Sequence, residues 1–414
     1  MKIWLITIGE PLPCDGESVR ILRTGILART LAARGHEVLW WSSTYDHRKK
    51  AHRSGVGVII DAGERYRIRL LHAIGYRRNI SLRRILNHRG LARAFAREAR
   101  AEPVPDLILC SLPILELCRE AAAYGRARGV PVALDIRDMW PDIIFDLLPR
   151  PLRRLGPILL YPMLRDVRTA CRQATALCST TEPFAEWGLR YAVRDPGPLD
   201  RAFPHGYDAT PPSPRQIEEA QEFWSRMGLR RDSGEFVACF IGTMSRQFDF
   251  ATVVEAARRT PDIRFVLCGV GERLESLKAS AQDCKNVLFP GWIDAPRIWT
   301  LMRLSAAGLA PYRSTPDFAL NLPNKPIEYL SAGLPIVSSL KGRLEELLAE
   351  AGCGLTYGDP DSLVKALRDL REDPERRRGM SERALALFRE RFDAAKVYAR
   401  MSEHLERIAA WRRS

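Results

Sequence analysis

The stretch NLPNKPIEYLSAGLPIV, residues Asn321 to Val337, predicts a short helix that runs into a buried strand. Asn324 is a good N-cap and Pro326 suits the first turn, while the glycine and proline that follow end the helix. A helix N-terminus exposes unpaired N–H groups, so an anionic phosphate can bind there, and Lys325 adds a full positive charge. Glu328 lies on the same helix face, where its carboxylate can accept hydrogen bonds from two adjacent hydroxyls. The stretch therefore indicates a cradle for a phosphate and a ribose. Taken alone, it also fits a helix in which Glu328 complements the dipole and Lys325 is a solvated surface charge.

Strand signals alternate with helical patterns throughout the chain, which predicts an α/β fold with doubly wound parallel sheets. In the first half the expected strands are Ile3–Ile8, Glu37–Ser42, Leu107–Ser111, Val132–Ile136 and Ala176–Ser179, with a first helix from Ser18 to Arg34. In the second half they are Phe236–Ile241, Ile263–Cys268, Val287–Phe289, Gly308–Ala310 and Ile336–Ser338, with a final helix from Ser381 to Trp411.

The length of the chain and one proline-rich segment indicate two domains. A chain of 414 residues is too long for a single core of ordinary size. Residues Asp195 to Pro214 hold six prolines and two glycines between the two series of strands, which marks a linker. We predict one domain over residues 1–200, a second over 201–385 and a final helical segment over 386–414.

Two loops in the second half follow expected strands and have room for a ligand. Gly242-Thr243-Met244-Ser245-Arg246 brings backbone amides and a guanidinium to one crevice, which suits a pyrophosphate, although a tight turn with a surface arginine has the same pattern. The second loop holds Gly269 and Gly271. A Gly-x-Gly alone is a weak signal and usually marks only a turn.

In the first half, Leu134-Asp135-Ile136-Arg137-Asp138 leaves a strand at the edge where open α/β sheets bind ligands. Asp138 can accept a proton from an acceptor, and Arg137 can bind a phosphate. The alternative is that Asp138 caps a helix and Arg137 is its salt-bridge partner.

The order N-K-x-x-E-Y-x-x-x-G-x-P-I-V closely resembles the nucleotide-sugar motif of the family 4 retaining glycosyltransferases, which build bacterial surface polysaccharides. The resemblance implies the GT-B fold, with two Rossmann-like domains facing a central cleft. The donor would lie on the second domain and the acceptor on the first, and the last helix would cross back to the first domain.

The resemblance also implies roles for individual residues. Lys325 and Arg246 would contact the leaving diphosphate, Glu328 the ribose, and Asp138 the reacting sugar and acceptor. The donor side would further include Gly16 before the first helix, Gly242, Thr243, Gly269, Gly271, Asn324 and, near the base, Gly291, Trp292 and Ile293. No metal or other cofactor is expected, and Asp359-Pro360-Asp361 fits a helix N-terminus better than a metal motif.

Two positions depart from the family pattern. The first glutamate of the family's two-glutamate pattern is replaced by Leu320, with Asp317 three residues earlier, so we expect a different contact to the sugar. His205 in His205-Gly206-Tyr207-Asp208 replaces the usual asparagine of the interdomain signature, which leaves a hinge role plausible.

The composition is that of a folded protein without a membrane span. The chain is 46% hydrophobic and 28% charged, and no segment reaches the roughly 18 apolar residues that a span needs. The N-terminus has a strand pattern and no small-residue cleavage site, so we expect no signal peptide. The nine cysteines form no C-x-x-C pair and the seven histidines are scattered, which favours reduced thiols in a cytosol and argues against zinc.

The net charge of +14 is concentrated in one region, because eleven arginines lie between Arg65 and Arg100. Residues Ser81–Arg100 place Leu82, Ile85, Leu86, Leu91 and Phe95 among these arginines, as an amphipathic helix on an anionic bilayer would. A helix packed on the core with a solvated basic face is the alternative. Pro149–Leu164 is a second possible lipid contact.

Together these patterns predict a glycosyltransferase that is peripheral to the cytoplasmic membrane face and acts on a lipid-linked acceptor. Two rivals remain: a sugar-nucleotide epimerase on the same fold, and a degenerate transferase that serves as a nucleotide-sensing scaffold. Nucleic acid is not an expected partner, because no aromatic RNA-binding motif accompanies the arginines.

Overall fold

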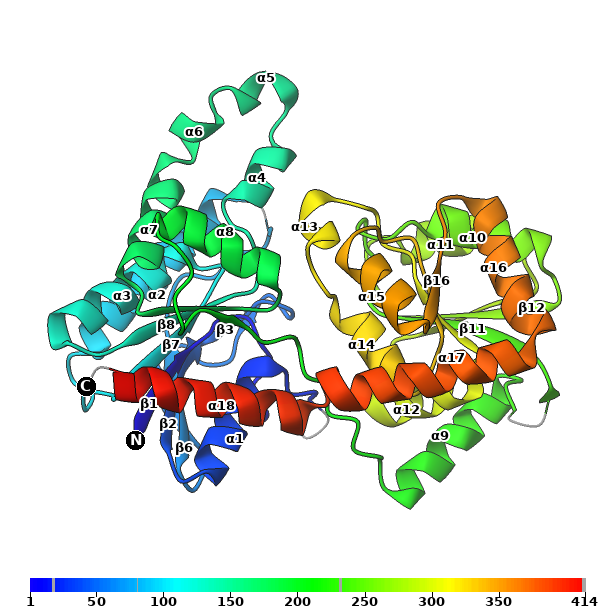
Figure 1. Cartoon of the computed structure of the whole chain (residues 1–414), viewed down its shortest axis with the longest axis horizontal. Helices are drawn as coiled ribbons and strands as arrows, with labels where there is room; N and C mark the ends of the chain where they lie inside the picture. Colours follow the sequence, from blue (N-terminus) through cyan, green and yellow to red (C-terminus); the bar gives the residue numbers. More distant parts are fainter. Residues whose placement is uncertain (17–18, 80, 231–232, 412–414) are drawn as a thin grey trace. The chain divides into compact units, whose positions relative to one another are not determined.

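The computed structural model describes residues 1–16, 19–79, 81–230 and 233–411, which form two compact units (Figure 1). Unit 1 takes the chain from Met1 to Pro204 and again from Val397 onward, and unit 2 takes His205 to Lys396. The chain thus passes between the units twice. The predicted boundaries, at 200/201 and 385/386, lie within about a dozen residues of these points.

Unit 1 is built on an eight-stranded sheet in the order β10-β9-β8-β7-β1-β2-β6-β5. All neighbours are parallel except β5 and β6. The strands are β1 (Lys2–Ile6), β2 (Glu37–Ser43), β5 (Val58–Gly63), β6 (Tyr66–Leu71), β7 (Leu107–Ser111), β8 (Val132–Ile136), β9 (Ala176–Ser179) and β10 (Arg201–Ala202), with a separate two-residue pair, β3 (Tyr45–Asp46) and β4 (Ala51–His52).

Helices cover both faces of this sheet (Figure 1). The helices of this unit are α1 (Arg23–Ala33), α2 (Leu82–Glu98), α3 (Leu115–Arg128), α4 (Asp142–Leu147), α5 (Arg150–Arg153), α6 (Gly156–Leu159), α7 (Tyr161–Gln173), α8 (Glu182–Ala192) and the last helix, α18 (Ala394–Trp411), with a short 3-10 turn, η1 (Pro13–Asp15). Edge contacts among Trp4, Trp41 and Phe95 join β1, β2 and α2 in the core.

Unit 2 has a parallel six-stranded sheet in the order β13-β12-β11-β14-β15-β16. The strands are β11 (Phe236–Ile241), β12 (Ile263–Cys268), β13 (Val287–Gly291), β14 (Ala307–Ala310), β15 (Ile336–Ser338) and β16 (Gly354–Thr356). The helices are α9 (Pro214–Arg226), α10 (Phe250–Arg259), α11 (Leu274–Ser280), α12 (Ala295–Leu304), α13 (Pro316–Ala319), α14 (Asn324–Ser331), α15 (Arg343–Ala351), α16 (Pro360–Glu372) and α17 (Pro374–Leu387).

The two sheets share one topology, and it confirms the predicted pair of Rossmann-like folds. Numbered in chain order, the strands of unit 2 run 3-2-1-4-5-6, and the parallel strands of unit 1 from β6 to β10 follow the same order with one strand added. In such sheets the strand order reverses beside the first strand, and ligands bind at the carboxyl ends of the strands at that point. The switch points are β1/β7 in unit 1 and β11/β14 in unit 2.

Three predicted helix ends were wrong. The first helix begins at Arg23. The carboxylate of Glu10, from a preceding loop, accepts the Thr24 backbone N–H and so caps the N-terminus of this helix. The predicted start at Ser18 lies outside the described residues. Helix α14 has Pro323 at its N-cap, so Asn324 is its first residue.

The single final helix expected from Ser381 is interrupted by a π turn over Phe388–Phe392, where both phenylalanines are buried. Asp393 then accepts the Lys396 backbone N–H and starts α18. Next to this break, Tyr207 exchanges backbone hydrogen bonds with Phe392 and Ala394, at 2.9 and 3.1 Å. The two segments of unit 2 that lead to unit 1 are therefore hydrogen-bonded to each other.

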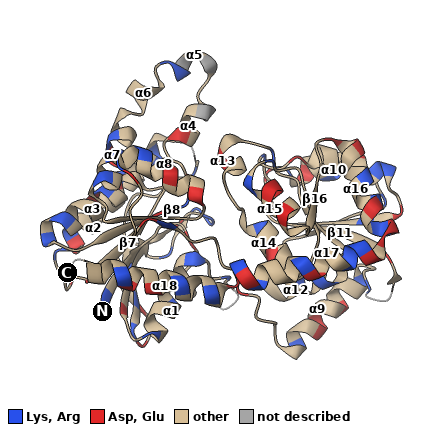
Figure 2. Ribbon diagram, viewed as in Figure 1, with Lys and Arg blue, Asp and Glu red and all other residues tan. Residues whose placement is uncertain are grey.

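Helix α2 agrees only in part with the predicted amphipathic helix. Its Leu91 and Phe95 are buried in the core, so they cannot face a bilayer, whereas Leu82 and Leu86 of its first turns are exposed. Its arginines are among the basic residues coloured blue in Figure 2. The core-packed alternative thus holds for the second half of this helix.

Helices α4 to α6 form an arm that projects from the body of unit 1 (Figure 1). Leu155, Ile158 and Leu159 of this arm and Tyr161, the first residue of α7, are exposed by 49%, 73%, 54% and 59%. In the described ranges, no helix combines the length and apolarity that spanning a bilayer requires.

Candidate functional site

The Lys325 side chain lies against the backbone that follows β11, at the switch point of unit 2. A Cβ atom built on Gly242 would overlap both Cε and Nζ of this lysine. Lys325 Nζ also lies 5.6 Å from the ring centroid of Phe240 and 5.1 Å from that of Phe248. Gly242 is therefore required for a close approach: it brings a half-buried ammonium group to the carboxyl end of the first strand.

The glycines of the second loop hold the loops of β11, β12 and β13 together. A Cβ on Gly269 would overlap the carbonyl oxygen of Gly242, and one on Gly271 would overlap that of Met244. The Gly269 N–H donates to the Gly291 carbonyl at 2.7 Å. The predicted glycines thus lie side by side, and their backbones form one edge of the candidate site.

Glu328 is placed one turn after Lys325 and is only 4% exposed. The next residue anchors the helix, because the Tyr329 hydroxyl accepts the Ile241 backbone N–H at 3.0 Å and ties α14 to the end of β11. Burial, and then the negative charge of Glu328, raise the pKa of Tyr312, which follows β14. The Glu328 carboxylate therefore lies close enough to Tyr312, beyond the end of β14, to influence its charge.

Arg246 and Thr243 lie on the same loop but face solvent. The Arg246 side chain is 82% exposed, and its Nε lies 3.4 Å from Oε1 of Glu272. Such surface pairs contribute little to stability, so a ligand with several phosphate oxygens would compete well for this guanidinium. Asn324 is also exposed, on the first turn of α14.

The base-side candidates separate into two environments. Gly291 ends β13 with a φ of +78°, and Trp292 beyond it is 61% exposed. Ile293 is buried in the hydrophobic core, so only its backbone remains available to a ligand. Gly16 belongs to unit 1, after the η1 turn, whereas the other predicted donor residues belong to unit 2.

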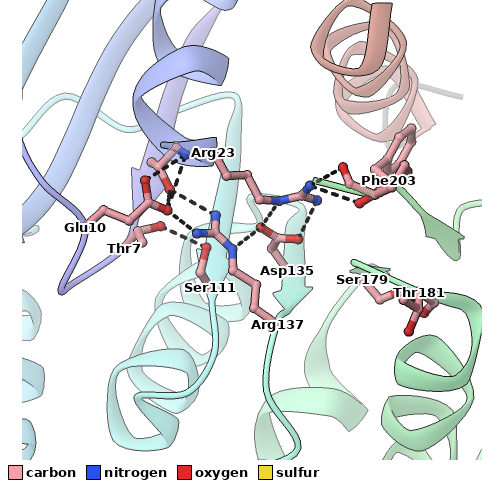
Figure 3. A network of polar contacts seen from close by, with 11 residues as sticks. Thr7, Glu10, Arg23, Ser111, Asp135, Arg137, Ser179, Thr181 and Phe203 are labelled. Atoms are coloured by element: carbon pink, nitrogen blue, oxygen red, sulfur yellow. Dashed lines mark hydrogen bonds and ion pairs between the residues drawn. The ribbon is translucent and has the colours of Figure 1, made fainter. Parts of the chain in front are cut away.

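A buried ionic network occupies the switch point of unit 1 (Figure 3). Arg23 donates two 3.0 Å hydrogen bonds to the Asp135 carboxylate, and Arg137 Nε donates to the same carboxylate at 2.6 Å. Arg137 also pairs with Glu10 and donates to the Thr24 hydroxyl. Burial alone would raise the pKa of Asp135, but the charges of Arg137 and Arg23 lower it well below its usual range. The carboxylate is therefore ionised at neutral pH.

The network bears on both interpretations of the loop after β8. Arg137 forms salt bridges with Asp135 and Glu10, whereas the second interpretation named Asp138 as its partner. Asp138, however, does not occupy the N-cap position of the next helix, because α4 begins at Asp142 with Pro141 at its N-cap. Asp138 follows Arg137 of the network and is half-buried. Its role in transfer stays a prediction.

Sequence reasoning missed the partners in this network, Glu10 and Arg23. The available signal was Asp135, an acid inside an otherwise apolar strand, which must be paired when buried. Arg23 also donates to the carbonyls of Phe203 and Pro204, both at 2.9 Å, and so holds the last residues of unit 1 before the chain crosses.

Comparison with known proteins agrees with this geometry. Residues 225–386, within unit 2, match the family model described as "Glycosyl transferases group 1", which agrees with the predicted resemblance to glycosyltransferases. A curated relative, the putative teichuronic acid biosynthesis glycosyltransferase TuaH of Bacillus subtilis, is 32% identical over 103 residues. The match spans 24% of this chain and 25% of TuaH, so the chain covers about a quarter of that relative's length.

Solved structures match over nearly the whole chain and define the fold as GT-B. Sucrose-phosphate synthase from Thermosynechococcus elongatus has a TM-score of 0.75 at 18% identity and covers 99% of both chains. HepE of Anabaena, solved with UDP and glucose, has a TM-score of 0.67 at 16% identity, over 98% of this chain and 99% of its own. WaaG, described as a glycosyltransferase of lipopolysaccharide biosynthesis, has a TM-score of 0.65 at 13% identity, over 98% and 99% of the two chains.

Proposed function

We propose that the protein transfers a sugar from a nucleotide diphosphate sugar, bound by unit 2, to an acceptor bound by unit 1. The observation that carries the proposal is the placement of Lys325 over Gly242 with the buried Glu328 one turn further along α14. A cation, helix N–H groups and a carboxylate then meet at the switch point of a glycosyltransferase domain.

In this proposal, unit 2 stabilises the negative charge that develops on the leaving diphosphate. Lys325 and the first N–H groups of α14 face the phosphates, and Arg246 exchanges its ion pair with Glu272 for phosphate oxygens. Glu328 accepts hydrogen bonds from the ribose hydroxyls. Asp138 of unit 1 accepts the acceptor proton, and the sugar keeps its anomeric configuration, as the motif's resemblance to retaining enzymes implies.

A thermal-shift screen against UDP, GDP, ADP and dTDP tests donor binding, because a ligand at 100 times its Kd adds about 2.7 kcal/mol of stability. Lys325→Met and Glu328→Gln should abolish this shift or reduce it strongly, while Lys341→Met, which removes an exposed lysine of the same unit, should leave it unchanged. Absence of a shift with all four nucleotides would contradict the proposal. Turnover of the sugar nucleotide without acceptor would indicate the epimerase, and binding without any turnover would indicate the scaffold.

We further propose that the acceptor is lipid-linked and that the arm of α4 to α6 lies on the inner face of the cytoplasmic membrane. The exposed Leu155, Ile158 and Leu159 support this, because each of these apolar side chains is exposed by 49% or more. Arg153 and Arg154 are exposed beside them, and basic residues near an anionic surface contribute about 1 kcal/mol each.

Flotation with phosphatidylglycerol vesicles tests the membrane contact. The protein should float with these vesicles and much less with neutral phosphatidylcholine vesicles. The double variant Ile158→Asp, Leu159→Asp should lose binding, whereas Val104→Asp, which changes an exposed apolar residue elsewhere on unit 1, should retain it. Equal binding by both variants would refute a role of the arm.

A further inference from the structure

Four of the chain's seven histidines gather at one end of unit 1, in a region that the proposed function has not used. His47 follows β3, His52 ends β4, His72 follows β6, and His88 is buried on α2. Because β2 and β6 are parallel to β8, this region lies on the same sheet edge as the loop that carries Asp138.

Three basic side chains surround one buried tyrosine in this cluster. Lys50 Nζ lies 5.0 Å from the ring centroid of Tyr76, and the guanidinium carbon of Arg84 lies 5.6 Å from it. The Tyr76 hydroxyl is 2.6 Å from Nδ1 of His47. Lys50 Nζ is 3.3 Å from the same imidazole nitrogen. Lys50 and Arg84 thus both lie against the ring of Tyr76, and Lys50 is also next to His47.

The acids close to this cluster are engaged elsewhere. The carboxylate of Asp46 accepts the backbone N–H groups of Arg48 and Lys49, and it lies 3.4 Å from the guanidinium of Arg53. Among the described residues, no carboxylate lies within ion-pair distance of Lys50 or Arg84. Burial, Lys50 and Arg84 together lower the pKa of His47 to about 4. Burial and Arg84 also lower the pKa of Lys50. This repulsion is a cost that a bound anion would remove.

The cluster adjoins the loop of the candidate site. Arg84 lies over a second ring, with its guanidinium carbon 4.7 Å from the centroid of Trp140, two residues after Asp138. An anion held between Lys50 and Arg84 would therefore lie next to the residue that we expect to accept the acceptor proton.

We propose that Lys50, Arg84 and His47 bind a phosphoryl group of the acceptor, as a phosphate or pyrophosphate. The proposal rests on the proposed function, because it names the chemical class of the acceptor. His47 donates a hydrogen bond to the anion, and Lys50 and Arg84 supply the charge. Tyr76 positions all three side chains.

The test is a titration of the full-length protein with inorganic pyrophosphate, followed by NMR of labelled histidine side chains. It uses the Lys325→Met background, so that the candidate site of unit 2 does not compete for the anion. Bound pyrophosphate should raise the pKa of His47 from about 4 toward the ordinary value near 6.5. Lys50→Asn suits the backbone φ of +55° at this residue and should weaken pyrophosphate binding at least tenfold, as should Arg84→Gln.

The control is Lys49→Asn, which removes the same charge from the exposed neighbour and should change the affinity less than twofold. An unchanged His47 signal, or equal effects of Lys49→Asn and Lys50→Asn, would overturn the proposal. A shift caused by phosphatidylglycerol vesicles but not by soluble pyrophosphate would also overturn it, because the cluster would then bind a bilayer surface. If the wild-type protein bound none of the four nucleotides while the His47 response in the Lys325→Met background stayed intact, only the proposed function would be refuted.

Discussion

The ammonium group of Lys325 lies where the side chain of any residue other than glycine at position 242 would have to be. Gly242→Ala should therefore push the lysine away from the end of β11 while it leaves the core untouched. Hydrogen bonds to charged groups contribute about 1.5–3 kcal/mol, so the affinity for the preferred nucleotide diphosphate should fall about tenfold or more.

Calorimetry of nucleotide binding measures this effect. The matched control is Gly358→Ala, since a Cβ at that glycine of the same unit meets no atom within 4 Å. Equal affinities for Gly242→Ala and the wild type would show that Lys325 does not contact the phosphates.

The hydroxyl of Tyr329 fixes the helix that carries Lys325 and Glu328. Tyr329→Phe removes the acceptor for the buried Ile241 N–H, and a buried donor without a partner costs about 1–3 kcal/mol. Urea unfolding should show a loss of that size. Tyr66→Phe is the control, because the Tyr66 hydroxyl is buried without a hydrogen-bond partner among the described residues, so its removal should leave stability nearly unchanged.

The Arg23–Asp135 pair should be important for the stability of unit 1. Asp135→Asn leaves two buried guanidinium groups short of a carboxylate, and breaking a buried pair costs about 3–5 kcal/mol. The control is Glu219→Gln on α9. The ion pair of Glu219 with Arg215 is exposed and contributes at most about 1 kcal/mol to stability.

The Asp135 effect should also depend on pH in a defined direction. The pKa of Asp135 is lowered in the folded state, so its contribution is present above the unfolded pKa of about 3.9 and is lost as the pH falls below it. The difference in unfolding free energy between wild type and Asp135→Asn should therefore be constant from pH 7 to 5 and shrink toward pH 3. A difference that stays constant down to pH 3 would mean that the carboxylate is not held in its charged form.

The strands and the donor side of the fold were predictable from the sequence because their signals are local. The limits of β7, β8, β9, β11, β12 and β15 match the expected ranges, since each is a short apolar run between turns. Lys325 and Glu328 lie on one helix, so their spacing alone places them together. By contrast, the sequence analysis did not predict β6. Arg67 and Arg69 alternate with buried residues along this strand, and they were assigned to the basic segment of the surface.

The unit 1 site depends on contacts that span long stretches of sequence. Glu10 and Arg137 are 127 residues apart, and Arg23 and Asp135 are 112 apart. No spacing rule connects such residues, and only the strand order β2-β1-β7-β8 brings their loops to one edge. The same reason explains the first helix, whose N-terminus is capped by Glu10 and so begins later than its own sequence suggests.

His88 should make the protein sensitive to mild acid. Burial, then the charges of Arg84 and His47, lower its pKa to about 3, although Glu116 lies 4.0 Å away on α3. Below the unfolded pKa of about 6.5, the unfolded chain binds a proton at this histidine that the folded chain does not bind. The free energy of unfolding therefore decreases as the pH is lowered, by at most about 1.4 kcal/mol per pH unit from this group. His88→Gln keeps a polar side chain and should flatten the curve of unfolding free energy between pH 6.5 and 4. His36→Gln should not, because His36 pairs with Glu406 near the surface. Parallel curves for wild type and His88→Gln would show that this imidazole becomes protonated in the folded protein.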